Sequence, residues 1–232
     1  MARSVSLSAA PVAVELARPI SPRRSGVVRI AHWLTAISFL ALLLTGIEIL
    51  LSHPRFYWGE TGTVMDAPLF NLPVPSSRDT VPTGYGYVLP DQNGWSRYLH
   101  FEAAWVAVLT GFVYISYGFL GGHFRRYLLL PNHSRSQYSP LQRTTYLAVI
   151  FVLFPLMIWT GLAMSPAVAG VFPPLVSTLG GQQSARTIHF FDTILLSTFF
   201  VVHVAMVIRA GFVTKMRGMV MGVLDNIQEH QA

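Results

Sequence analysis

Long runs of apolar residues, separated by polar segments, dominate the chain. A membrane core of about 30 Å is crossed by about 20 apolar residues of α-helix, each rising about 1.5 Å. The chain holds four runs of that length, at about residues 27–51, 98–120, 144–168 and 187–213. The pattern therefore predicts an all-α integral membrane protein, an up-and-down four-helix bundle over residues 27–213. Residues 1–26 and 214–232 are predicted to be tails, and residues 52–97 a long loop between helices 1 and 2.

The composition agrees with a membrane protein and excludes an ordinary soluble domain. Only 11% of the 232 residues are charged and 52% are hydrophobic, whereas a soluble domain has about 25% charged residues. Residues 1–26 hold several arginines and no continuous apolar core, so they do not have the form of a secretory signal peptide. We interpret them as a flexible cytoplasmic tail.

The distribution of charge predicts the orientation of the bundle. Loop 121–143 carries four arginines and no acidic residue, the N-terminal tail is rich in arginine, and the C-terminal tail holds Lys215 and Arg217 next to the fourth span, whereas loop 52–97 carries four acidic residues. Because basic residues collect on the cytoplasmic side of membrane proteins, both termini are expected in the cytoplasm and loop 52–97 in the periplasm. The net charge of +6 is thus a sign of topology and not of nucleic-acid binding.

Loop 52–97 is longer than a simple connection and rich in aromatic residues. A loop of this kind is either a folded cap or docking surface, or a set of interfacial anchors at the lipid headgroups, and the sequence leaves both interpretations open. The aromatic residues are Phe56, Tyr57, Trp58, Phe70, Tyr85, Tyr87 and Trp95.

Histidine is the main candidate for chemistry, because the chain has no cysteine. Disulfides, thiolate-bound iron–sulfur clusters and covalently attached haem are therefore excluded. Four of the eight histidines lie inside the predicted spans, where ionisable residues are costly and usually functional. A single such histidine could be explained by a hydrogen bond between helices, so the arrangement of the four decides. They are His32, His100, His189 and His203.

The depth of each histidine predicts two pairs. His203 follows His189 by 14 residues, which places both on one face of the fourth span, about 21 Å apart along its axis. His100 is expected beside His189 at the outer end, and His32 beside His203 at the inner end. Two pairs of imidazoles suit two haem groups, each with two axial ligands, better than structural zinc, which takes four ligands. Span three has no Asp, Glu, Lys, Arg or His and is assigned to packing.

Several other polar residues lie near these histidines, and the sequence leaves their roles open. An arginine precedes three of the histidines by three residues, and it could contact a haem propionate or anchor a helix end at the headgroups; these are Arg29, Arg97 and Arg186. Four glycines in the spans could leave room for a flat macrocycle or serve helix packing. The roles of the acidic residues Glu48, Glu102 and Asp192 are not determined by the sequence.

The segment RIAHWLTAISFLALLLTG, the early histidines of spans one and two, and the pair His189 and His203 together carry a resemblance. They resemble the prokaryotic four-helix dihaem cytochromes b, the group of bacterial cytochrome b561, nickel-iron hydrogenase cytochrome b, formate dehydrogenase gamma subunits and thiosulfate reductase cytochrome b. The resemblance covers about residues 26–218. It implies a multi-pass protein of the bacterial inner membrane with two haem b groups.

The long loop is similar to that of members that accompany a periplasmic molybdopterin oxidoreductase. This resemblance implies a partner subunit docked on loop 52–97, and a quinone or quinol that reacts near the inner haem. The expected function is electron transfer between that oxidoreductase and the membrane quinone pool. Two alternatives are a stand-alone cytochrome b561-type quinone oxidoreductase with a small diffusible donor, and a haem-free membrane anchor.

Overall fold

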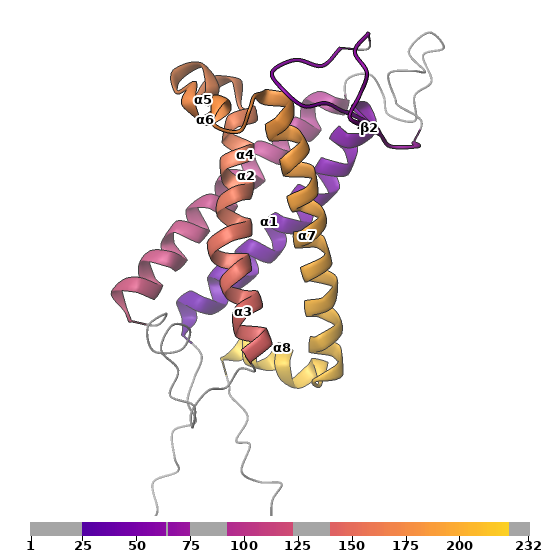
Figure 1. The fold of residues 1–232 in the computed structure, drawn as a ribbon. Helices are drawn as coiled ribbons and strands as arrows, with labels where there is room; N and C mark the ends of the chain where they lie inside the picture. The colour runs from indigo at the N-terminus through magenta and orange to yellow at the C-terminus, as the bar shows by residue number, and fades with distance from the viewer. Residues whose placement is uncertain (1–24, 64, 75–91, 123–139, 223–232) are drawn as a thin grey trace, which may run out of the picture.

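The computed structural model describes residues 25–63, 65–74, 92–122 and 140–222 (Figure 1). Within this part of the chain, four helices are long and apolar enough to cross a membrane. The first two are α1 (Gly26–Ser52) and α2 (Gln92–Leu120). The third combines α3 (Pro140–Ala148), the π-helical turn η3 (Val149–Leu153) and α4 (Phe154–Met164), and the fourth is α7 (Gln182–Arg209). The predicted helical membrane bundle is confirmed.

Helices α1 and α2 pack against each other along a seam of small residues. The buried residues of α1 recur every seven positions and are all small: Ala31, Ser38, Thr45 and Ser52. Helix α2 contributes a matching series with the same spacing: Ser96, Ala103 and Thr110. Small side chains let two helix backbones approach closely inside a membrane, where hydrophobic burial does not hold helices together. This seam makes α1 and α2 one helical pair, and the contact of α4 with α7 makes the other.

The third span ends earlier than predicted. Helix α4 stops at Met164, and Ser165 takes an extended conformation with ψ 116° before Pro166. A residue before proline is driven out of the helical region by the proline ring, so α4 ends about four residues before the predicted end of the span, at about residue 168. Pro155 also explains the π-helical turn before it, because proline lacks an N–H and its ring clashes with the preceding turn.

The fourth span differs from the prediction at both ends. Helix α7 runs from Gln182 to Arg209, whereas residues 187–213 were predicted. Gly211, with φ of +90°, turns the chain, and α8 (Phe212–Met221) then lies across the end of the bundle (Figure 1). Part of the predicted tail 214–232 is therefore helical. We call the end of the bundle that carries α8 the inner end.

The opposite, outer end carries a small hairpin and two short helices (Figure 1). Strand β1 (Arg55–Phe56) pairs antiparallel with β2 (Phe70–Asn71). The short helices are α5 (Pro166–Val171) and α6 (Pro174–Ser177), and α6 contributes Val176 to a buried cluster with Ala163 and Ala185. The hairpin and short helices together cover the start of α7.

Aromatic contacts and hydrogen bonds fix the hairpin on α7. Phe56 is 1% exposed, and its ring lies 4.5 Å from that of Phe190 on α7. The hydroxyl of Thr187 donates to the carbonyl of Tyr57 at 2.8 Å. These contacts show a folded cap for Phe56 and Tyr57, whereas Trp58 is 60% exposed. Two of the predicted loop aromatics, Tyr85 and Tyr87, lie outside the described residues.

Candidate functional site

The structure brings the outer two histidines together. His100 comes from α2 and His189 from α7, and their ring centroids lie 6.4 Å apart with the ring planes inclined at 57°. The two helices belong to different helical pairs, because α2 packs on α1 and α7 on α4. The histidine pair therefore bridges the two halves of the bundle at its outer end.

The inner two histidines repeat this arrangement. The ring centroids of His32 on α1 and His203 on α7 lie 6.3 Å apart at an interplanar angle of 52°. Aromatic neighbours frame the pair: the ring of Trp33 meets His32 edge-on at 5.3 Å, and Phe199 stacks on His203 at 5.8 Å. The structure thus contains both pairs that depth in the membrane predicts, one towards each end of α7.

The spacing within each pair fits two imidazoles on opposite sides of one metal ion. A metal–imidazole nitrogen bond is about 2.0–2.1 Å, and a five-membered ring places its centroid about 1.1 Å behind that nitrogen. Two rings facing each other across an iron would then have centroids about 6.3 Å apart, whereas a tetrahedral ion would bring them to about 5.2 Å. The described residues also hold no group of three or more His, Cys, Asp or Glu that could bind a metal ion. The donor set therefore suits haem, which needs only two axial imidazoles.

Two threonines that the sequence analysis did not single out contact the outer histidines. The hydroxyl oxygen of Thr45 lies 2.9 Å from Nδ1 of His100, and that of Thr160 lies 2.9 Å from Nδ1 of His189. Thr45 comes from α1 and Thr160 from α4, so each histidine meets a threonine of the helix paired with its own. Because Nδ1 faces the threonine on each ring, Nε2 is the nitrogen left for a metal.

The glycine after each threonine lies beside the same ring. A Cβ added at Gly46 would be 3.6 Å from Cε1 of His100, and one added at Gly161 would be 3.7 Å from Cε1 of His189. The repeated step Thr-Gly in spans one and three was the sequence signal for this arrangement.

Two of the arginines near the histidines bind main-chain carbonyls in this structure. The guanidinium of Arg186 donates to the carbonyl of Arg55 at 3.1 Å and to that of His53, and it lies 4.8 Å over the ring of Phe56. Arg186 thereby fastens the hairpin to the start of α7. Its predicted contact with a haem propionate stays a prediction.

Arg29 and Arg97 differ in their surroundings. At the inner end, Arg29 donates to the carbonyls of Met219 and Val220, the last turn of α8, and Trp33 Nε1 also donates to Met219 at 3.3 Å. Arg97 is exposed on α2 one turn before His100. Of the three arginines, Arg97 is the one whose guanidinium has no hydrogen bond to another described residue.

Asp192 is the buried acidic residue of the site region. It is 2% exposed, and neither carboxyl oxygen has a hydrogen-bond partner among the described residues. Glu102 is exposed on α2 and Glu48 is half-buried on α1. Asp192 therefore makes no hydrogen bond to a histidine of the two pairs.

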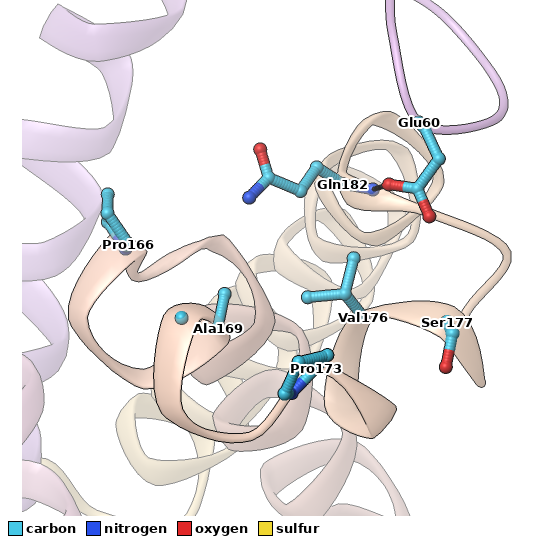
Figure 2. Close-up of a pocket in the computed structure, with 8 residues that line it drawn as sticks. Glu60, Pro166, Ala169, Pro173, Val176, Ser177 and Gln182 are labelled. Atoms are coloured by element: carbon cyan, nitrogen blue, oxygen red, sulfur yellow. Dashed lines mark hydrogen bonds between the residues drawn. The ribbon is translucent and has the colours of Figure 1, made fainter.

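A depression of about 430 Å³ lies at the outer end, apart from the histidines. Figure 2 shows Glu60 of the loop pointing at the start of α7, where its carboxylate accepts from the N–H of Gln182 at 3.4 Å. Short helices α5 and α6 form the other wall, and the lining residues are Glu60, Pro166, Ala169, Gly170, Pro173, Val176, Ser177 and Gln182. No histidine lines it, so it belongs to the surface of the cap.

Comparison with known proteins identifies the family to which the sequence is similar. The sequence profile of the prokaryotic cytochrome b561 family matches residues 23–222, nearly the whole chain. A protein from Azospira oryzae named as a protein-methionine-sulfoxide reductase subunit, YedZ1, is 25% identical over 203 residues, which cover 78% of this chain and 87% of that protein. The range of the family match includes all four histidines of the two pairs.

The assignment of the chain to a family rests on the match over residues 23–222, and the four apolar helices and the imidazole pairs agree with that family. The chain belongs to the prokaryotic cytochrome b561 family, as a multi-pass subunit of the inner membrane that binds haem b.

Proposed function

We propose that the protein is a dihaem b-type cytochrome subunit that carries electrons between a periplasmic oxidoreductase and the membrane quinone pool. The observation that carries this proposal is the pair of imidazole sites, with centroid distances of 6.4 Å at the outer end and 6.3 Å at the inner end. His100 and His189 would hold the outer haem, and His32 and His203 the inner haem. Haem b, when bound, supplies an iron that carries one electron by changing between Fe²⁺ and Fe³⁺.

Helix α7 determines the distance between the two histidine pairs. His189 and His203 lie on the same helix, about 21 Å apart along its axis, so one rigid element fixes the separation of both pairs across the bundle. Helices α1 and α2 supply the opposite histidine of the inner and outer pair, respectively. The residues of this chain thus form two cofactor sites at different depths, the arrangement that electron transfer across a membrane needs.

The outer cap supports a protein partner at the periplasmic end. Phe70 of the hairpin lies 5.9 Å from Phe190, the residue directly after His189, so a protein docked on the hairpin is close to the outer pair. The hairpin also leaves large apolar side chains exposed: Trp58, Met65 and Leu69. Exposed apolar patches of this kind mark interaction sites. We assign the partner to this part of loop 52–97.

The relative from Azospira oryzae is named as a subunit of a reductase that acts on protein methionine sulfoxide. Its name supports an oxidoreductase as the partner here, and the family resemblance extends that partner to the molybdopterin type.

The same resemblance supports a quinone or quinol at the inner pair, where two electrons and two protons are exchanged for each quinol. Arg29 and Trp33 hold α8 beside that end of the bundle.

Co-purification tests the partner assignment. The triple variant Trp58→Ser, Met65→Ser, Leu69→Ser removes the exposed apolar side chains of the hairpin, and Phe212→Ser changes an exposed apolar residue at the inner end as a control. We expect the triple variant to lose the oxidoreductase subunit and the control to keep it. Equal recovery of the subunit from both variants would contradict docking on the hairpin.

Reduction by quinol in proteoliposomes separates the alternatives. The proposal predicts that added quinol reduces the bound haem, and that the partner is needed for turnover with a periplasmic substrate. Purified protein without haem absorbance would instead support the anchor. Turnover of a small donor without any partner subunit would support the stand-alone oxidoreductase.

A further inference from the structure

The hydroxyl oxygens of Thr45 and Thr160 each lie within hydrogen-bond distance of two main-chain carbonyls and one histidine ring nitrogen, and these contacts determine which ring nitrogen of each outer histidine carries hydrogen. Thr45 Oγ1 lies 2.7 Å from the carbonyl of Ala41, one helical turn earlier, and 2.9 Å from His100 Nδ1. Thr160 Oγ1 lies 2.8 Å from the carbonyl of Leu156 and 2.9 Å from His189 Nδ1. The same arrangement therefore occurs twice, on helices α1 and α4.

A hydroxyl has one hydrogen and can accept with its lone pairs, whereas a main-chain carbonyl only accepts. The hydroxyl hydrogen of each threonine therefore points to the carbonyl one turn earlier, and a lone pair of Oγ1 faces the ring. Only a ring nitrogen that carries hydrogen can complete the second hydrogen bond. Nδ1–H of His100 then donates to Thr45, and Nδ1–H of His189 donates to Thr160.

A second carbonyl lies near each threonine hydroxyl. Thr45 Oγ1 also lies 3.2 Å from the carbonyl of Leu42, and Thr160 Oγ1 lies 3.1 Å from the carbonyl of Met157. Each of these two residues precedes its threonine by three positions, so the two surroundings match again. Because main-chain carbonyls only accept, both of them direct the hydroxyl hydrogen to the main chain and leave a lone pair of Oγ1 for the ring.

We propose that Thr45 and Thr160 are positioning residues that hold His100 and His189 in the Nδ1–H form and thereby lower the reduction potential of the outer haem. This inference rests on the proposed haem-binding function. In the Nδ1–H form, Nε2 keeps its lone pair for the iron. An acceptor on Nδ1–H also makes the imidazole a stronger base, which stabilises Fe³⁺ relative to Fe²⁺.

Redox titration of isosteric variants tests the proposal. Thr45→Val and Thr160→Val keep the shape of the side chain and remove the acceptor, whereas Thr45→Ser and Thr160→Ser keep the hydroxyl. Thr198→Val is the matched control, because Thr198 makes the same bond to a carbonyl one turn earlier, that of Ile194, on the exposed side of α7. Haem content, measured on the same samples, separates loss of cofactor from a change in potential.

We expect each valine variant to shift the Fe³⁺/Fe²⁺ ratio of one of the two haems about tenfold towards Fe²⁺ at a given ambient potential, a rise of about 59 mV for one electron. The serine variants and Thr198→Val should titrate as the unchanged protein does. Unchanged potentials in both valine variants, with haem retained, would overturn the inference while leaving the haem-binding function intact.

Nitrogen-15 spectra of the haem-free protein in liposomes give a readout that needs no cofactor. The proposal predicts that His100 and His189 are in the Nδ1–H form, and that the valine variants lose this preference at one ring each. A predominance of the Nε2–H form at both rings in the unchanged protein would also overturn it. This measurement decides the inference if a variant binds no haem.

Discussion

The imidazole rings of His100 and His189 lie with their centroids 6.4 Å apart, although one residue belongs to α2 and the other to α7. The inner pair repeats this distance to within 0.1 Å, at 6.3 Å between His32 and His203. The bundle thus holds two imidazole pairs of nearly equal spacing, both close to the spacing expected for two imidazoles on opposite sides of an iron.

Removal of one histidine of a pair is expected to remove one haem. His189→Ala should abolish the outer haem and His203→Ala the inner haem, because haem held by two axial imidazoles loses half of its protein ligation. The amplitude of the reduced-minus-oxidised spectrum should fall by about half in each variant. His133→Ala, which changes a histidine outside the predicted spans, is the control. Full amplitude in His203→Ala would exclude that residue as a ligand.

Loss of the Arg186 side chain is expected to free the hairpin from α7. Arg186→Ala removes the donors to the carbonyls of His53 and Arg55 and the contact with Phe56. Hydrogen bonds from a charged donor contribute about 1.5–3 kcal/mol, so the amide hydrogens of residues 53 and 55–57 should exchange about tenfold faster or more. Exchange rates equal to those of the control Arg97→Ala would show that Arg186 does not hold the cap.

Gly181 is expected to tolerate no side chain. Its φ is +115°, and an added Cβ would lie 2.4 Å from the carbonyl of Gly59 in the loop. Gly181→Ala should therefore lower the free energy of unfolding by about 1–3 kcal/mol or more, from backbone strain alone. Gly94→Ala is the control, because a Cβ there meets nothing within 4 Å. Equal thermal midpoints for the two variants would contradict the close approach of Gly181 and Gly59.

Replacement of Asp192 by a neutral amide is expected to stabilise the protein. Asp192 is 2% exposed, and its carboxyl oxygens have no hydrogen-bond partner in the described part of the chain. Burial of a polar group without a partner costs about 1–3 kcal/mol, and burial of a charge costs more. Asp192→Asn should therefore raise the thermal midpoint, whereas Glu102→Gln, at an exposed position, should leave it unchanged. A lower midpoint for Asp192→Asn would reveal a stabilising role for the charge.

The four spans and the spatial pairing of the histidines could be predicted from the sequence. The length of an apolar run follows from the thickness of the membrane that it crosses. Because only histidines at the same depth can meet, the depths of the four histidines limit how they can pair. The ends of two spans were predicted less well, because apolar residues continue on both sides of Pro166 and Gly211. At both positions the local backbone, and not the hydropathy, ends the helix.

The contacts of individual polar side chains were much harder to predict. Arg186 precedes His189 by one turn, which suggested a propionate, but its guanidinium binds carbonyls of a loop 131 and 133 positions away in the chain. Thr45 gave the appearance of an ordinary intramembrane threonine, and its role depends on the approach of His100 from another helix. Such contacts depend on tertiary packing, for which hydropathy and charge carry no information.

The number of haem groups per chain, measured on the purified protein together with its redox titration, decides whether both histidine pairs bind haem. We expect two haem b groups per chain that titrate as two one-electron components, and a His32→Ala, His100→Ala double variant without haem. A limit of one haem per chain at full incorporation, or two haems retained by the double variant, would contradict the assignment of the two histidine pairs.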